Sequence, residues 1–210
     1  MVCSRRRNLR SYMQLTLPKA ILFDMDGTLT DERIDFAALR AELGLGTDEA
    51  ILEAVARMPV AYQAQAERVI DHYETQAAER STLNAGCLEL LKWLDDCGIA
   101  RALITRNTRQ SVRTVFDLHG VHFDVAITRE DGAYKPDPAP LFKACQQLNV
   151  SPANAWMVGD WKYDIEAANR AGVHAVWLSY GRERPFDAVP DRTVVDLLDL
   201  SRVLTAHLNH

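Results

Sequence analysis

The sequence lacks the features of a membrane or secreted protein. It has no apolar run near the roughly 20 residues that a membrane-spanning helix needs, and no apolar segment follows its basic start as in a secretory signal. Its four cysteines form no CxxC pair and no Cys/His ligand spacing. Cys87 and Cys97 are expected on one helix, too far apart for a disulfide. Reduced thiols fit a cytoplasmic protein without a membrane partner, which is what we expect.

The sequence also has no general excess of basic residues. Its formal charge is −5 at pH 7, with 24 Lys and Arg against 29 Asp and Glu. Nucleic-acid-binding domains usually carry a basic patch or stripe, so we expect no nucleic-acid partner. One basic cluster lies within residues 1–12, which hold four arginines and no acid. Such an arm could bind an acidic surface or RNA, but basic runs are often without function. We interpret residues 1–18 as a flexible leader, with Met13 as an alternative start.

Short apolar runs alternate with helical patterns along most of the chain. The runs predicted to be buried strands are residues 20–24, 101–105, 125–128, 155–159 and 175–178. The segments with helical periodicity around them are residues 86–97, 108–119, 138–148 and 163–171. In the first of these helices, Leu88, Leu91 and Leu94 are expected to share the buried face. Strands that alternate with helices pair in parallel, so the pattern predicts a doubly wound α/β sheet.

Residues 31–82 interrupt this alternation. They contain helical patterns at residues 35–43, 47–58 and 60–80, with Thr47 as the expected N-cap of the second. A helical insert of about 50 residues is too long for an ordinary crossover between strands. We therefore expect an α/β core formed by residues 19–30 and 83–210, with residues 31–82 as a small all-helical cap domain, here named the helical cap.

Polar side chains follow the ends of the predicted strands. In open α/β sheets, ligands bind outside the carboxyl ends of the strands, near the point where the strand order reverses. The residues expected to meet at this edge are Asp24 and Asp26 after the first strand, Thr105, Arg106 and Asn107 after the second, Lys135 after the third, and Asp160 and Asp164 after the fourth.

Several carboxylates at one edge repel one another unless a cation lies between them. Two unit charges about 4 Å apart interact by about 4 kcal/mol at an effective dielectric constant of about 20. Mg²⁺ relieves this repulsion, and it prefers one or two carboxylates together with water and substrate phosphate. A carboxylate such as Asp24 can attack phosphorus and form an aspartyl-phosphate. Lys135 and the Thr105 hydroxyl would then bind the phosphoryl oxygens as charge redistributes.

Four segments, in order, resemble the motifs of the haloacid dehalogenase superfamily. They are Asp24-Met25-Asp26-Gly27-Thr28-Leu29, Ile104-Thr105-Arg106-Asn107, Lys135-Pro136-Asp137-Pro138, and Gly159-Asp160 followed by Asp164. The resemblance covers nearly the whole chain after Lys19, and the first and fourth motifs are the specific ones. It implies a Mg²⁺-dependent hydrolase in which a helical cap follows the first strand.

The resemblance also implies a role for each motif residue. Asp24 would be the nucleophile, and Asp26 would protonate the leaving group and then deprotonate the water that hydrolyses the aspartyl-phosphate. Mg²⁺ would bind Asp24, Asp160 and the backbone carbonyl of Asp26, while Asp164 would orient a metal-bound water. The residues expected to bind the substrate phosphate are Thr105, Arg106, Asn107 and Lys135, of which Lys135 is also counted as catalytic.

Branches of the superfamily differ at these positions. Haloacid dehalogenases proper lack a carboxylate where Asp26 stands and use no Mg²⁺. Phosphonate hydrolases use a lysine of the cap, whereas residues 31–82 contain no lysine. Asp26 therefore favours a phosphate ester. Residues 128–131, before Lys135, are most similar to phosphoglycolate-phosphatase-like members, but Trp161 stands where many relatives have a small residue.

The expected function is hydrolysis of a small-molecule phosphate ester, of the phosphoglycolate or sugar phosphate class, by a monomer or homodimer. The same motifs would serve a phosphomutase of the β-phosphoglucomutase type, although the helical cap is small for a bisphosphorylated intermediate. A non-catalytic binding protein of the same fold is a further alternative. Candidates for contacts between the cap and the substrate are Arg33, Arg57, Arg68, His72 and Tyr73, for which a solvated helix face is the simpler interpretation. The tryptophans Trp93, Trp156 and Trp177 are expected to serve core and subunit-surface packing rather than to form an aromatic cage.

Overall fold

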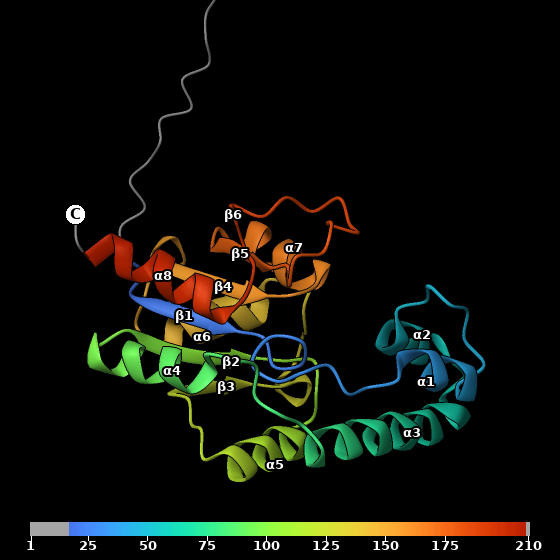
Figure 1. Ribbon diagram of the computed structural model, residues 1–210. Coiled ribbons are helices and arrows are strands. Elements are labelled where there is room, and N and C mark those ends of the chain that lie inside the picture. Colours follow the sequence, from blue (N-terminus) through green and yellow to red (C-terminus); the bar gives the residue numbers. More distant parts are fainter. Residues whose placement is uncertain (1–16, 209–210) are drawn as a thin grey trace, which may run out of the picture.

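The computed structural model describes residues 17–208, so most of the predicted leader, with Met13, lies outside the described residues. Its centre is a six-stranded parallel sheet with the strand order β3-β2-β1-β4-β5-β6 (Figure 1). The strands are β1 (Ala20–Phe23), β2 (Ala100–Ile104), β3 (Val125–Ile127), β4 (Ala155–Gly159), β5 (His174–Leu178) and β6 (Arg192–Val194). The strand order reverses at β1, so the predicted doubly wound α/β class is confirmed.

Helices cover both faces of the sheet. All of β1 is buried, with Ile21 and Phe23 in one hydrophobic cluster and Ala20 and Leu22 in the other, because successive side chains of a strand point to opposite faces. The helices of the first cluster are α4 (Cys87–Asp96), α5 (Arg109–His119) and α8 (Leu197–Leu208), and those of the second are α6 (Ala139–Gln147) and α7 (Lys162–Ala171) (Figure 1).

The helical cap lies to one side of this core. Its helices are α1 (Phe36–Glu42), α2 (Ile51–Arg57) and α3 (Val60–Glu79). They share a hydrophobic cluster of their own, which includes Leu39, Val55 and Ile70. Figure 1 shows α1 and α2 away from the sheet, with the long α3 returning to the core beside α5. Nowhere in residues 17–208 is a helix both long enough and apolar enough to cross a membrane.

The predicted ends of α5 are confirmed. The Thr108 hydroxyl accepts a hydrogen bond from the backbone N–H of Ser111 at 3.1 Å and so caps the first turn. Gly120 ends the helix at φ 63°, a left-handed conformation that glycine adopts without steric cost.

The prediction of Thr47 as N-cap of α2 is wrong. The helix begins at Ile51, and Ala50 occupies the N-cap position. Glu49 is held in the preceding loop, because its carboxylate accepts from the backbone N–H of Gly46 at 2.9 Å and its carbonyl accepts from Arg40 Nε at 3.0 Å. These hydrogen bonds keep the chain out of the helical conformation at this point.

The predicted buried face of α4 also needs correction, since Leu88 is 52% exposed. The residues that α4 buries are Cys87, Leu90, Leu91 and Leu94. Counted from Cys87, these residues follow after three, four and seven positions, which matches the 3.6-residue period of an α-helix. The predicted set, Leu88, Leu91 and Leu94, is spaced by three residues throughout and matches that period less well.

The sequence pattern also missed the end of the sheet. β6 has only three residues, among them Arg192 and Thr193, and it lies at the sheet edge, so it has no apolar run that would indicate a buried strand. α8 follows it and buries Leu197, Leu200 and Leu204 against the sheet. Two short 3₁₀ turns, Arg129–Asp131 and Pro152–Asn154, complete the elements.

Candidate active site

The candidate site lies at the carboxyl ends of β1 and β4, which are neighbours at the reversal of strand order. Asp24 follows β1, and its backbone N–H donates to the carbonyl of Val158 in β4 at 3.0 Å. Asp160 follows β4 directly. The sheet itself therefore places these two carboxylates beside each other, as the rule for open α/β sheets predicts.

Lys135 connects the carboxylates of the site. Its Nζ donates to Asp24 Oδ1 at 2.6 Å and to Asp164 Oδ1 at 2.7 Å, and its side chain is only 2% exposed. Burial by itself would lower the pKa of Lys135, but the charges of Asp164 and Asp24 outweigh that effect and raise it. Lys135 is thus a buried cation fixed between two aspartates.

Three carboxylates could hold a metal ion. Asp24, Asp160 and Asp164 each offer an oxygen, and these oxygens lie within 4.8 Å of one another. Burial, followed by the charges of Asp24 and Asp164, raises the pKa of Asp160 to about 8. A divalent cation would relieve this repulsion and favour the charged form, as hard cations with oxygen ligands do.

The surroundings of these carboxylates fit Mg²⁺. Gly27 leaves room for Asp160, since a Cβ atom at Gly27 would lie 2.6 Å from Asp160 Oδ2. Asp164 has its two oxygens occupied, one by Lys135 Nζ and the other by the backbone N–H of Trp161 at 3.1 Å. Asp24 and Asp160 are therefore the better candidates for direct ligands, and Asp164 is placed to support them.

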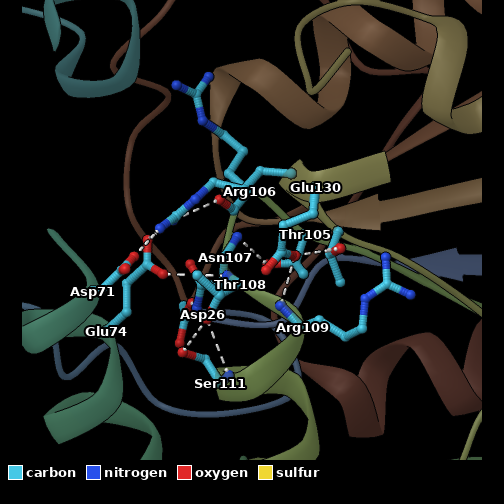
Figure 2. Close-up of polar contacts among 12 residues, drawn as sticks. Asp26, Asp71, Glu74, Thr105, Arg106, Asn107, Thr108, Arg109, Ser111 and Glu130 are labelled. Atoms are coloured by element: carbon cyan, nitrogen blue, oxygen red, sulfur yellow. Dashed lines mark hydrogen bonds and ion pairs between the residues drawn. The ribbon is translucent and has the colours of Figure 1, made fainter. Parts of the chain in front are cut away.

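Asp26 faces the same space but has a different environment. Burial and then the charge of Asp24 raise its pKa to about 7, although the hydrogen bond from Asn107 opposes the shift. Asn107 Nδ2 donates to Asp26 Oδ2 at 2.5 Å (Figure 2). A carboxyl group with this pKa can both give and take a proton near neutral pH.

The structure also brings the residues after β2 to the site. Thr105 is buried and lines the cavity, and its Oγ1 accepts from the backbone N–H of Asn107 at 3.1 Å. Arg106 lines the cavity as well, but its guanidinium binds Glu53 of the helical cap and the carbonyl oxygen of Lys135. The structure thus gives the side chains of Arg106 and Asn107 protein partners, while their expected contact with phosphate stays a prediction.

A cavity of about 380 Å³ connects these residues to the helical cap. On the cap side it is lined mainly by apolar residues, which are Ile34, Phe36, Leu39, Ala50, Ile51, Leu52 and Ile70. Arg40 and Glu32 also line it, and the sequence pattern did not single them out. No local signal distinguishes Arg40 from the other arginines of the cap, because the packing of α1 on α3 decides which of them faces the core.

The cap residues expected to contact substrate lie elsewhere. Within the described residues, the cavity lining includes none of Arg33, Arg57, Arg68, His72 and Tyr73. Some of them pair within the cap or its connection to β1: Arg33 with Asp31 at 2.5 Å, and the Tyr73 hydroxyl with Glu42 at 3.0 Å. Arg33, Arg57, Arg68 and His72 are exposed, in line with the simpler interpretation of a solvated surface, whereas Tyr73 packs against the hydrophobic cluster of the cap.

Two further residues support Asp160. Trp177 Nε1 donates to the backbone carbonyl of Asp160 at 3.0 Å, so this tryptophan does more than pack. A buried indole N–H needs an acceptor, and that requirement is the signal that could have indicated it. Arg182 Nη2 lies 3.3 Å from Asp160 Oδ2. Trp161, which lines the cavity, turns its ring toward Phe186 at a centroid distance of 5.9 Å.

Comparisons with known proteins show the family of this chain. The sequence model of a family described as haloacid dehalogenase-like hydrolase matches residues 35–178. A haloacid dehalogenase-like hydrolase domain-containing protein of Arabidopsis thaliana is 35% identical over 184 residues, which cover 80% of this chain and 74% of that protein. A phosphoglycolate phosphatase of Pseudomonas putida is 33% identical over 210 residues, covering 86% of this chain and 77% of that enzyme.

A solved structure shows the same architecture. The HAD phosphatase from Thermococcus onnurineus superimposes with a TM-score of 0.66 at 26% identity, covering 88% of this chain and 97% of that one. The chain belongs to the haloacid dehalogenase-like hydrolase family, which confirms the resemblance found in its four motifs.

Proposed function

We propose that the protein is a Mg²⁺-dependent phosphatase that hydrolyses a small-molecule phosphomonoester through an aspartyl-phosphate on Asp24. The observation that carries the proposal is the contrast between two neighbouring aspartates. Asp24 lies against the Lys135 ammonium at 2.6 Å, as a charged nucleophile needs, whereas the pKa of Asp26 is raised to about 7. Two carboxyl groups with such different environments suit the roles of nucleophile and general acid.

The residues of the chain perform the reaction in two steps. A carboxylate oxygen of Asp24 attacks phosphorus, the bond to the leaving oxygen breaks, and Asp26 gives its proton to that oxygen. Asp26 then takes a proton from the water that attacks the aspartyl-phosphate, which releases inorganic phosphate and restores Asp24. Lys135 and Thr105 hold the phosphoryl oxygens in both steps. Asp24, Asp160 and the backbone carbonyl of Asp26 would hold Mg²⁺, with Asp164 in support, and the ion would supply positive charge between the carboxylate of Asp24 and the phosphate group.

The cavity and the relatives support the proposed substrate class. In this proposal, residues 19–30 and 83–210 form the core and residues 31–82 form the helical cap. The cap would close over the leaving group and exclude bulk water. The relative from Pseudomonas putida is a phosphoglycolate phosphatase. A cavity of about 380 Å³ suits a small leaving group such as glycolate or a sugar.

Replacing the nucleophile tests the proposal. Asp24→Asn should abolish Mg²⁺-dependent hydrolysis of an aryl phosphate, because a neutral amide does not attack phosphorus, while the circular dichroism spectrum stays that of the wild type. Asp117→Asn, at an exposed position of α5, is the matched control and should retain full activity. Turnover by Asp24→Asn near the wild-type rate would refute the assignment.

A further inference from the structure

Arg106 links the helical cap to the backbone of Lys135. Its Nη2 donates to both carboxylate oxygens of Glu53, on α2, at 2.9 and 2.8 Å. Its Nη1 donates to the carbonyl oxygen of Lys135 at 2.6 Å. The guanidinium also lies over two aromatic rings, with Cζ 4.8 Å from the Tyr134 centroid and 4.3 Å from the Tyr163 centroid.

These contacts leave the Arg106 guanidinium little freedom. Its side chain is only 18% exposed, and the guanidinium lies over the rings of two tyrosines. A guanidinium binds a carboxylate with a fixed fork of donors, so its direction is set by the partner carboxylate. That partner, Glu53, belongs to the cap and moves with α2.

We propose that Arg106 is a positioning residue that makes the placement of Lys135 depend on the position of the helical cap. This inference rests on the proposed function. With the cap closed, Glu53 holds the guanidinium in the plane from which it binds the Lys135 carbonyl. That contact fixes the backbone from which Nζ reaches Asp24 and Asp164. When α2 moves away, Arg106 loses its charged partner and Lys135 loses part of its support, so catalysis is favoured only when bulk water is excluded.

A second cap–core contact serves as the comparison. Arg129 pairs with Asp71 and Glu74 of α3, and Figure 2 shows these two acidic side chains projecting from α3 toward the core. Within residues 17–208, the remaining hydrogen bond of the Arg129 side chain goes to the carbonyl of Arg106 at 3.3 Å. Breaking the pair with Asp71 therefore weakens the attachment of the cap without removing the hydrogen bond to Lys135.

The test compares Glu53→Gln, Arg106→Gln and their double variant with Asp71→Asn. With an aryl phosphate and Mg²⁺, either single change at the Glu53–Arg106 pair should lower kcat by about 10- to 100-fold, since misplacement by about 1 Å has effects of this size. KM should change by less than about threefold, and the double variant should be no worse than the worse single variant. Glu53→Asp, which keeps the charge, should recover part of kcat. Asp71→Asn should stay within about threefold of the wild type.

Several results would overturn the inference. They are an unchanged kcat in Glu53→Gln, an equal loss in Asp71→Asn, or a change in KM alone. A large rise in the inhibition constant of inorganic phosphate for Arg106→Gln, without one for Glu53→Gln, would make Arg106 a phosphate ligand instead. A wild type without Mg²⁺-dependent hydrolysis would overturn the proposed function and this inference with it. An active wild type with an unchanged Glu53→Gln variant would overturn the inference alone.

Discussion

Replacing Gly159 by alanine should displace Asp164 and through it Lys135. Gly159 ends β4, and a Cβ atom there would lie less than 3.0 Å from the Asp164 side chain. Carbon atoms in contact prefer a separation of about 3.5–4.0 Å, so the carboxylate must move by roughly 1 Å. Asp164 holds Lys135 at 2.7 Å, and a shift of this size would loosen that ion pair.

The expected effects follow from this displacement. Overpacking a well-packed interior costs about 1–3 kcal/mol of unfolding free energy, which corresponds to a fall in Tm of about 2–12 °C for a chain of this size. Misplacing a catalytic group by about 1 Å can lower the rate by about 100-fold. Gly159→Ala should therefore fold, with a lower Tm, and lose most of its activity.

The assay is Mg²⁺-dependent hydrolysis of an aryl phosphate, with Tm measured by circular dichroism on the same samples. Gly46→Ala is the matched control, because Gly46 also has no left-handed φ and its Cβ would lie no closer than 3.6 Å to the nearest neighbouring atom, Glu49 Oε2. Activity of Gly159→Ala within about threefold of the control would show that the position of Asp164 is unimportant for the reaction.

Two further results are expected. Burial and Asp24 raise the pKa of Asp26 to about 7, and the proposed mechanism uses its protonated form as the acid. The value of kcat/KM for an alkyl phosphate should therefore fall as pH rises through about 7. A 4-nitrophenyl ester, whose leaving group needs less protonation, should show a weaker fall; identical profiles would contradict the role of Asp26. EDTA should stop turnover, and millimolar Mg²⁺ should raise the Tm of the wild type but not of Asp160→Asn. An equal rise in Asp160→Asn would remove that residue from the metal site.

The sequence predicted those residues of the site whose positions are set by the ends of the strands. Asp24 and Asp160 follow buried apolar strands, and parallel pairing of β1 and β4 brings them together whatever the rest of the chain does. Lys135 and Asp164 follow β3 and β4 with short connections, so their approach to the same edge was also predicted. The local sequence predicts these positions because a strand of four or five apolar residues is buried inside a parallel sheet, and the residue after it then lies at the sheet edge.

The residues that the sequence did not reveal depend on contacts between distant segments. Glu53 and Arg106 are 53 positions apart, and Glu53 on α2 looks like any charged residue of a solvated helix. Which face of α1 and α2 meets the core is decided by the packing of the cap cluster around Leu39 and Ile70. With this packing, Arg40 lines the cavity and Glu53 binds Arg106. Arg33 and Tyr73 are not part of the cavity lining. A single sequence holds no local pattern that distinguishes these outcomes.

The roles proposed for the site's aspartates rest on their different partners, since their side chains are chemically identical. Both carboxylate oxygens of Asp164 accept hydrogen bonds, one from Lys135 and the other from the Trp161 backbone, which makes direct metal binding by Asp164 less favourable. One carboxylate oxygen of Asp24 accepts from Lys135, so the other oxygen can attack phosphorus or bind the metal. Among residues 17–208, the carboxylate of Asp160 has only the long contact to Arg182, at 3.3 Å, so it is the carboxylate that most needs a cation. Asp26 is hydrogen-bonded instead to the neutral amide of Asn107, so its negative charge is neutralised by binding a proton. The hydrogen bonds of the protein therefore support the proposed division into nucleophile, metal ligand, supporting residue and acid.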